Sequence, residues 1–259
     1  MTFNIRRAIW AATLFSTLVT TLVTTRAEAQ APDASRKYAV LSLMGDSLTI
    51  VSQQIATGSR LNKNIQQQLP VSDEAFDVPA LRASAAVLQR RGVKGEVALM
   101  TSSTPTLYAD MEALLKVSPL ALPADLREAL KESKATHLIV LSKLRADTDV
   151  RFLNQSGGTG TLEGLGFYYD SETRVVKNDT GETFTGYVAA YVYLNVTLVD
   201  LATMQALQSE VVRTTETVLA DTPNTSSNPW NALSAAQKVG LLRKMIETEL
   251  GRVLPKLIR

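Results

Sequence analysis

The chain has 259 residues, of which 45% are hydrophobic and 20% are charged, a composition typical of folded globular proteins. Its 27 basic and 25 acidic side chains give a formal net charge of +2, and no basic stripe indicates a nucleic-acid partner. The absence of cysteine excludes disulfides, thiolate metal ligands and cysteine nucleophiles, and the single histidine excludes a multi-histidine metal centre. We therefore expect neither a metal nor a cofactor.

Residues 1–29 have the layout of a cleaved export signal. Arg6-Arg7 form a short basic stretch, residues 8–25 are an apolar, Thr-rich run, and Ala27-Glu28-Ala29 has the small-x-small pattern that signal peptidase reads. Cleavage after Ala29 would leave a single domain over residues 30–259, located in the periplasm or secreted, that meets the membrane only through the signal. The alternative is an uncleaved anchor, because the run approaches the roughly 20 residues that span a bilayer.

Strands and helices alternate in the first half of the predicted mature chain. Apolar and β-branched runs predict strands over residues 37–44, 47–54, 64–71, 96–103 and 136–144, the last of them central in a sheet. We expect a hairpin turn at Gly45-Asp46 between the first two strands. Apolar residues at helical spacing predict helices over residues 77–92, 107–117 and 123–134.

The second half contains the strongest strand signal. Residues 154–166 include five glycines and predict a loop. Strict alternation over residues 187–200 predicts a long strand, which returns over residues 206–218 as an antiparallel hairpin. Ser234 is placed to cap a C-terminal amphipathic helix. The order of elements predicts an α+β fold, a two-layer mixed sheet with helices mainly on one face.

A short motif, Met44-Gly45-Asp46-Ser47-Leu48-Thr49, follows the first predicted strand. It resembles the first sequence block of the GDSL (SGNH) esterases, and the resemblance implies Ser47 as a nucleophile whose backbone N–H helps to stabilise an oxyanion. A serine nucleophile needs a positioned base. His137 is a poor candidate, because Lys134 stands where the family has aspartate. We keep a secreted serine ester hydrolase as the alternative function and interpret Gly45-Asp46 as a turn.

Two groups of aromatic side chains are candidate binding residues. Phe167, Tyr168 and Tyr169 follow the glycine-rich segment, which lacks the Gly-Lys-Ser/Thr ending of a phosphate-binding loop. Tyr191 and Tyr193 share one face of the long predicted strand, and exposed tyrosines are frequent recognition anchors. The same tyrosines could instead be covered by a helix or by the glycine-rich segment, and the sequence leaves both alternatives open.

Two runs in the second half carry a more diffuse resemblance, ATHLIVLS at residues 135–142 and YLNVTLVDLAT at residues 193–203. With the preceding helix and the returning strand they are similar, over roughly residues 77–218, to envelope proteins of the curli-secretion, penicillin-binding-protein-activator and Tol-translocation N-domain type. The resemblance implies a partner in the envelope and no catalysis. We therefore predict an exported, non-enzymatic binding or assembly module whose partner is an envelope protein or a small ligand.

Overall fold

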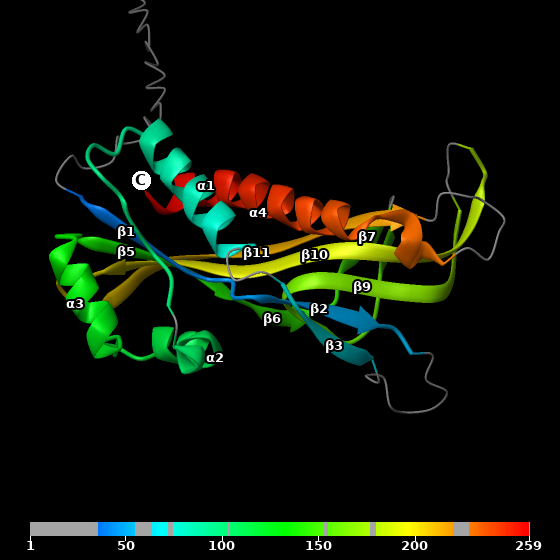
Figure 1. Cartoon of the computed structure of the whole chain (residues 1–259), viewed down its shortest axis with the longest axis horizontal. Helices are drawn as coiled ribbons and strands as arrows, with labels where there is room; N and C mark the ends of the chain where they lie inside the picture. Colours follow the sequence, from blue (N-terminus) through cyan, green and yellow to red (C-terminus); the bar gives the residue numbers. More distant parts are fainter. Residues whose placement is uncertain are drawn as a thin grey trace, which may run out of the picture. The chain divides into compact units, whose positions relative to one another are not determined.

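The computed structural model describes residues 36–54, 64–71, 75–102, 104–152, 155–176, 180–219 and 228–258. The predicted export signal lies outside these residues. In chain order (Figure 1), the described elements are β1 (Tyr38–Leu43), β2 (Ser47–Ser52), β3 (Ile65–Pro70), α1 (Asp77–Arg90), β4 (Ala98–Met100), α2 (Pro105–Leu115), α3 (Ala124–Glu132), β5 (His137–Lys143), β6 (Arg145–Asp147), β7 (Val150–Phe152), β8 (Gln155–Gly157), β9 (Thr161–Val176), β10 (Thr183–Asp200), β11 (Gln205–Leu219), a 3-10 turn (Pro229–Ala232) and α4 (Ala235–Leu257).

The long strand β10 organises a nine-stranded mixed sheet. Along one edge, β10 pairs first with β9, over residues 183–193, and then with β5, over residues 194–200. Along its other edge it pairs with β11 as the predicted antiparallel hairpin. Strand β10 therefore joins two smaller groups of strands, β3-β2-β9 and β5-β1-β4.

The predicted hairpin at Gly45-Asp46 is wrong. Both edges of β1 are occupied by parallel partners, β5 on one side and β4 on the other. The chain therefore continues past Gly45, which has a φ of 75°, into the other group of strands, where β2 lies between β9 and β3. Gly45-Asp46 is therefore the point at which the chain passes from the β5-β1-β4 group to the β3-β2-β9 group.

The predicted loop over residues 154–166 is also wrong, because β9 begins at Thr161 and β8 occupies Gln155–Gly157. A Cβ on Gly166 would lie 1.8 Å from the carbonyl oxygen of Thr49 in β2. A Cβ on Gly164 would lie 2.7 Å from the side chain of Lys143. Glycine is needed at these two positions because another element packs too closely for a side chain, and not because the segment forms a loop.

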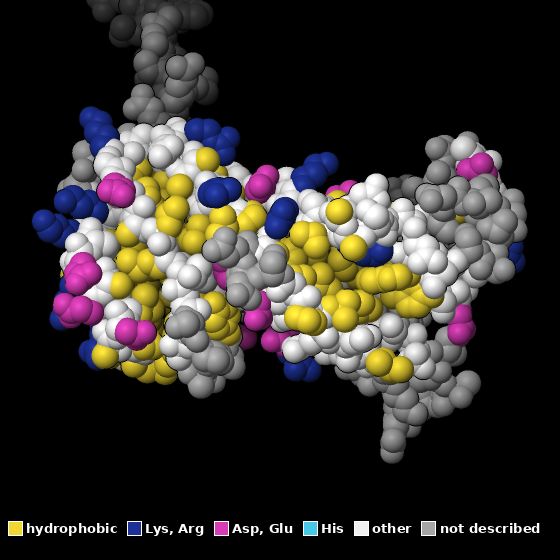
Figure 2. All heavy atoms as spheres, viewed as in Figure 1, with side chains coloured by type: hydrophobic (Ala, Val, Ile, Leu, Met, Phe, Trp, Pro, Cys, Tyr) yellow, Lys and Arg dark blue, Asp and Glu magenta, His cyan; other side chains and the backbone are white. Residues whose placement is uncertain are grey.

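Helices cover both faces of the sheet, and the α+β class is confirmed. The longer helices, α1 and α4, pack on one face against apolar residues of β1, β5 and β10. The shorter α2 and α3 pack on the opposite face, against residues of β1, β4, β5 and the end of β10. Hydrophobic side chains reach the surface toward the α2–α3 end and toward the β2–β9 end in the view of Figure 2. Within the described ranges, no helix is long and apolar enough to cross a membrane.

The start of α4 follows the sequence prediction. The Ser234 hydroxyl accepts a hydrogen bond from Gln237 N, and the Gln237 side chain accepts one from Ser234 N, which completes a capping box. Apolar residues at helical spacing then place one face of α4 on the sheet.

Candidate functional site

The structure buries four of the five aromatic candidates. Phe167, Tyr168, Tyr191 and Tyr193 are completely buried, and Tyr169 is half-buried against the core beneath α1 and α4. The sequence left open whether the tyrosines of the long strand are exposed or covered. The structure shows that they are covered, so the expectation that they form an exposed face for a partner is wrong.

The buried tyrosines act as internal cross-links. The Tyr193 hydroxyl accepts a hydrogen bond from Asp149 N at 3.1 Å, and the Tyr191 hydroxyl donates to the Thr49 carbonyl at 3.2 Å. The Tyr168 hydroxyl accepts from Thr159 N at 2.9 Å and donates to the Gln53 side chain. Burial raises the pKa of Tyr191 well above its ordinary value, so the phenol stays protonated. These hydroxyls hold β2 and the segments around β6–β8 against β9 and β10.

The two residues of the esterase alternative are not brought together. Ser47 begins β2 beyond the carboxyl end of β1, whereas His137 begins β5 and pairs with Tyr38 at the amino end of β1. The six-residue strand β1 lies between them, a length of about 20 Å. His137 Nδ1 instead shares a hydrogen bond with the Thr136 hydroxyl at 2.9 Å. The resemblance to the esterase block thus does not extend to a serine–histidine pair.

A buried carboxylate organises the turn that carries this motif. Asp77, in the first turn of α1, accepts hydrogen bonds from the Ser42 hydroxyl (2.5 Å), Met44 N (2.9 Å) and Gly45 N (3.2 Å). Burial raises its pKa above the ordinary value, although these hydrogen bonds act in the opposite direction. Local sequence patterns give no signal for the role of Asp77, because its partners lie more than 30 positions earlier in the chain.

Lys143 lies at the end of β5 near the same turn. Burial lowers the pKa of its amine, opposed by the negative charges of Glu163, Asp46 and Asp77. Its aliphatic chain fills the space over Gly164. Nowhere in the described ranges do three or more acidic or histidine side chains form a group that could hold a metal ion.

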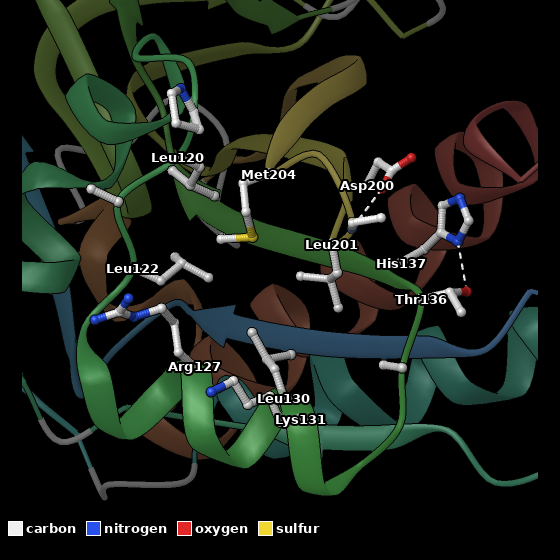
Figure 3. A pocket seen from close by; sticks show the side chains of 14 residues that line it. Leu120, Leu122, Arg127, Leu130, Lys131, Thr136, His137, Asp200, Leu201 and Met204 are labelled. Atoms are coloured by element: carbon white, nitrogen blue, oxygen red, sulfur yellow. Dashed lines mark hydrogen bonds between the residues drawn. The ribbon is translucent and has the colours of Figure 1, made fainter.

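A cavity of about 740 Å³ opens at the other end of β5, between α3 and the turn that joins β10 to β11 (Figure 3). Most of the side chains that line it are apolar and come from the segment before α3, from α3 and from the turn: Pro119, Leu120, Leu122, Leu130, Leu201 and Met204. The volume falls within the ~300–1,000 Å³ range of small-molecule sites.

Local hydrogen bonds fix the walls of this cavity. Leu120 N donates to the Met204 carbonyl at 2.7 Å, which ties the segment before α3 to the β10–β11 turn. The Asp200 carboxylate closes that turn by accepting from Ala202 N (2.7 Å) and Thr203 N (3.1 Å). These two hydrogen bonds hold the pKa of Asp200 below its ordinary value. These hydrogen bonds therefore hold the β10–β11 turn and the segment before α3 in one arrangement at the cavity.

Charge is separated across the cavity. Arg127 and Lys131, four residues apart on α3, lie on one side, whereas Thr136, His137 and Asp200 lie on the other (Figure 3). Lys131 is 3.7 Å from Glu128. Among the described residues, the Arg127 guanidinium has no ion pair or side-chain hydrogen bond. The α3 side of the cavity thus presents a net positive charge beside apolar walls.

No family model matches the chain, and no curated protein matches it. Several solved structures resemble it over most of its length, including the following three. One is a protein from Xanthomonas campestris with family model DUF330 (11% identity, TM-score 0.37, 88% of this chain and 89% of that chain). The second is a putative neuraminyllactose-binding hemagglutinin homologue from Helicobacter pylori (8%, 0.39, 89% and 89%). The third is a hypothetical protein from Chlamydia trachomatis (8%, 0.33, 86% and 98%). Similarities of this size assign no function to the chain.

Proposed function

We propose that the protein is an exported, non-enzymatic binding module that holds an anionic amphiphile, a molecule with one apolar chain and one anionic head, in the cavity beside α3. The observation that carries the proposal is the combination of apolar walls with two cationic side chains on one side of the cavity. Export to the periplasm or the cell exterior, with cleavage near Ala29, is part of the proposal and rests on the pattern of residues 1–29.

The chemistry of the walls favours this class of ligand. An alkyl chain that packs against leucine and methionine side chains buries apolar surface. This burial stabilises the complex by about 25 cal/mol for each Å² of apolar surface removed from water. The planar guanidinium of Arg127 can bind a carboxylate, sulfate or phosphate head through two parallel hydrogen bonds. Asp200, on the opposite side, disfavours an anionic head there, so we expect the ligand to bind in one orientation.

Filling the cavity should weaken binding strongly. Ala202 lines the cavity and is exposed, so Ala202→Trp places an indole in the cavity without removing a core contact. We expect the affinity for dodecanoate, measured by isothermal titration calorimetry, to fall by about tenfold or more, which corresponds to ~1.4 kcal/mol. Ala236→Trp, on the exposed first turn of α4 and outside the cavity, is the matched control. Equal affinities in both variants, or no binding by the unsubstituted protein, would contradict the proposal.

The cation on α3 should determine preference for the head group. Arg127→Ala removes the guanidinium but leaves the apolar walls. Because Arg127 is exposed, we expect dodecanoate to bind about two- to fivefold more weakly, which corresponds to the ~0.5–1 kcal/mol of a solvent-exposed ion pair. Dodecanol, which has the same chain and no charge, should bind both proteins equally. A parallel loss for the two ligands would show that Arg127 acts through packing and not through its charge.

A further inference from the structure

The carboxyl ends of β1 and β5 lie together where the two groups of strands meet. Lys143 ends β5 and pairs with Leu194 of β10, whereas the preceding residue of β10, Tyr193, pairs with Gly164 of β9. Strand β1 lies between two parallel neighbours, β4 and β5, and the helices that precede these neighbours lie on opposite faces of the sheet. In α/β sheets with this arrangement, ligands bind outside the carboxyl ends of the strands. The junction is therefore a candidate for a second binding site.

The amine of Lys143, at this junction, is half-buried and has no partner. Two other lysines in the described ranges are also shielded from solvent, and both amines are bonded. Lys238 donates to two backbone carbonyls, and Lys256 bonds Glu210 at 3.3 Å. Among the described residues, the Lys143 amine makes no hydrogen bond and no ion pair. Burial also lowers its pKa, and an uncharged amine is a nucleophile.

The charges that surround this amine are negative. They come from Asp46 in the turn after β1, from Asp77 at the start of α1 and from Glu163 in β9. The neighbour from α2 is Tyr108: a Cβ on Gly45 would lie 3.6 Å both from the amine nitrogen and from the Tyr108 ring. Burial raises the pKa of Tyr108, so this phenol is uncharged. The junction therefore favours an uncharged ligand over an anionic one.

We propose that Lys143 is a covalent attachment site for small, uncharged aldehydes, which it holds as an imine. The nitrogen lone pair forms a bond to the carbonyl carbon, and the π electrons of the C=O bond move to the oxygen. Both nitrogen protons are then transferred through solvent to that oxygen, which leaves as water while a C=N bond forms. The step needs no oxidant, reductant or third reactant, and water reverses it. Because the amine makes no hydrogen bond, no existing contact has to break before the attack.

Reductive alkylation with propanal and cyanoborohydride measures imine formation at each lysine, because hydride converts the imine into a stable secondary amine. The test uses the protein isolated after expression of the full chain and quantifies the modified peptides by mass spectrometry. We expect Lys143 to react about threefold faster or more at pH 7 than Lys94. Lys94 is exposed and, within the described segments, unpaired, so it is the matched reference in the same molecule. Equal rates, or a slower rate at Lys143, would overturn the proposal.

Two further comparisons use the ratio of the Lys143 rate to the Lys94 rate. The ratio should fall as the pH rises from 7 toward about 10, because an exposed lysine also loses its proton in that range. Replacing propanal by the anionic aldehyde glyoxylate should lower the ratio by about threefold or more, because the carboxylates around Lys143 repel an anion. A ratio that is independent of pH, or equal for the two aldehydes, would overturn the proposal. The cavity lies at the other end of β5 and does not include Lys143, so the two proposals can fail separately.

Discussion

Replacing Gly166 by alanine is expected to destabilise the folded protein severely. The added Cβ would lie 1.8 Å from the Thr49 carbonyl oxygen and 2.7 Å from the Tyr191 hydroxyl. The nearest atom belongs to the backbone of β2, so the clash cannot be relieved by rotating a side chain. It would separate β2 from β9 and break the hydrogen bond between Tyr191 and Thr49. We expect a loss of more than ~4 kcal/mol in unfolding free energy, measured by urea denaturation followed by circular dichroism.

Gly240→Ala provides the matched control. Gly240 lies in α4, and apart from its chain neighbours and the backbone of its own helix, no described atom lies within 4 Å of the position of an added Cβ. Alanine at a helix interior is more favourable than glycine by roughly 0.5–1 kcal/mol, so this variant should be slightly more stable than the unsubstituted protein. A Gly166→Ala protein with unchanged stability would contradict the close packing of β2 on β9.

Asp77→Ala is expected to cause the second large loss of stability. The carboxylate accepts three hydrogen bonds, two of them from the backbone N–H groups of Met44 and Gly45. Removing it leaves these donors unpaired in a buried site, which costs roughly 1–3 kcal/mol for each group. We expect a total loss of about 3 kcal/mol or more, measured by urea denaturation at pH 7. Asp125→Ala, in the first turn of α3 and exposed, should change stability by less than about 0.5 kcal/mol.

The pH dependence of stability provides a separate test of Asp77. Because burial raises the pKa of this carboxyl above 3.8, the folded protein takes up the proton at a higher pH than the unfolded chain. Lowering the pH through the folded-state pKa should therefore stabilise the folded state through this group. Asp77→Asn cannot titrate. The unfolding free energy of the unsubstituted protein, minus that of Asp77→Asn, should rise as the pH falls from 7 toward 4. A difference that stays constant or falls would contradict the direction of the shift.

The elements with a single dominant pattern could be predicted from the sequence. Alternation over residues 187–200 has no competing interpretation, and the structure contains β10 there with its hairpin partner β11. The Ser234 cap and the spacing of apolar residues after it likewise define α4. Both signals are local, since they involve residues within a few positions of one another.

The features that were missed depend on contacts between distant positions. The glycines at 164 and 166 predict a loop when only their neighbours are considered, but the reason for them is the approach of Lys143 and of β2. The cavity combines residues before and within α3 with the β10–β11 turn, some 70 positions later. Only the spacing of Arg127 and Lys131 on one face of α3 was visible in the sequence. Burial of the tyrosines likewise depends on β6 and β7, short strands that carry little periodic signal.

The shared strand β10 has a consequence for how the protein acquires its structure. Strands β5 and β9 are synthesised before residues 183–200, and each has an open edge until β10 is available. The pairs β1–β5 and β2–β9 also join positions about a hundred residues apart, and such long-range contacts slow folding. Folding of the whole sheet is therefore expected to begin late and to need nearly the entire chain, so that fragments ending before Thr183 should remain without a stable tertiary structure.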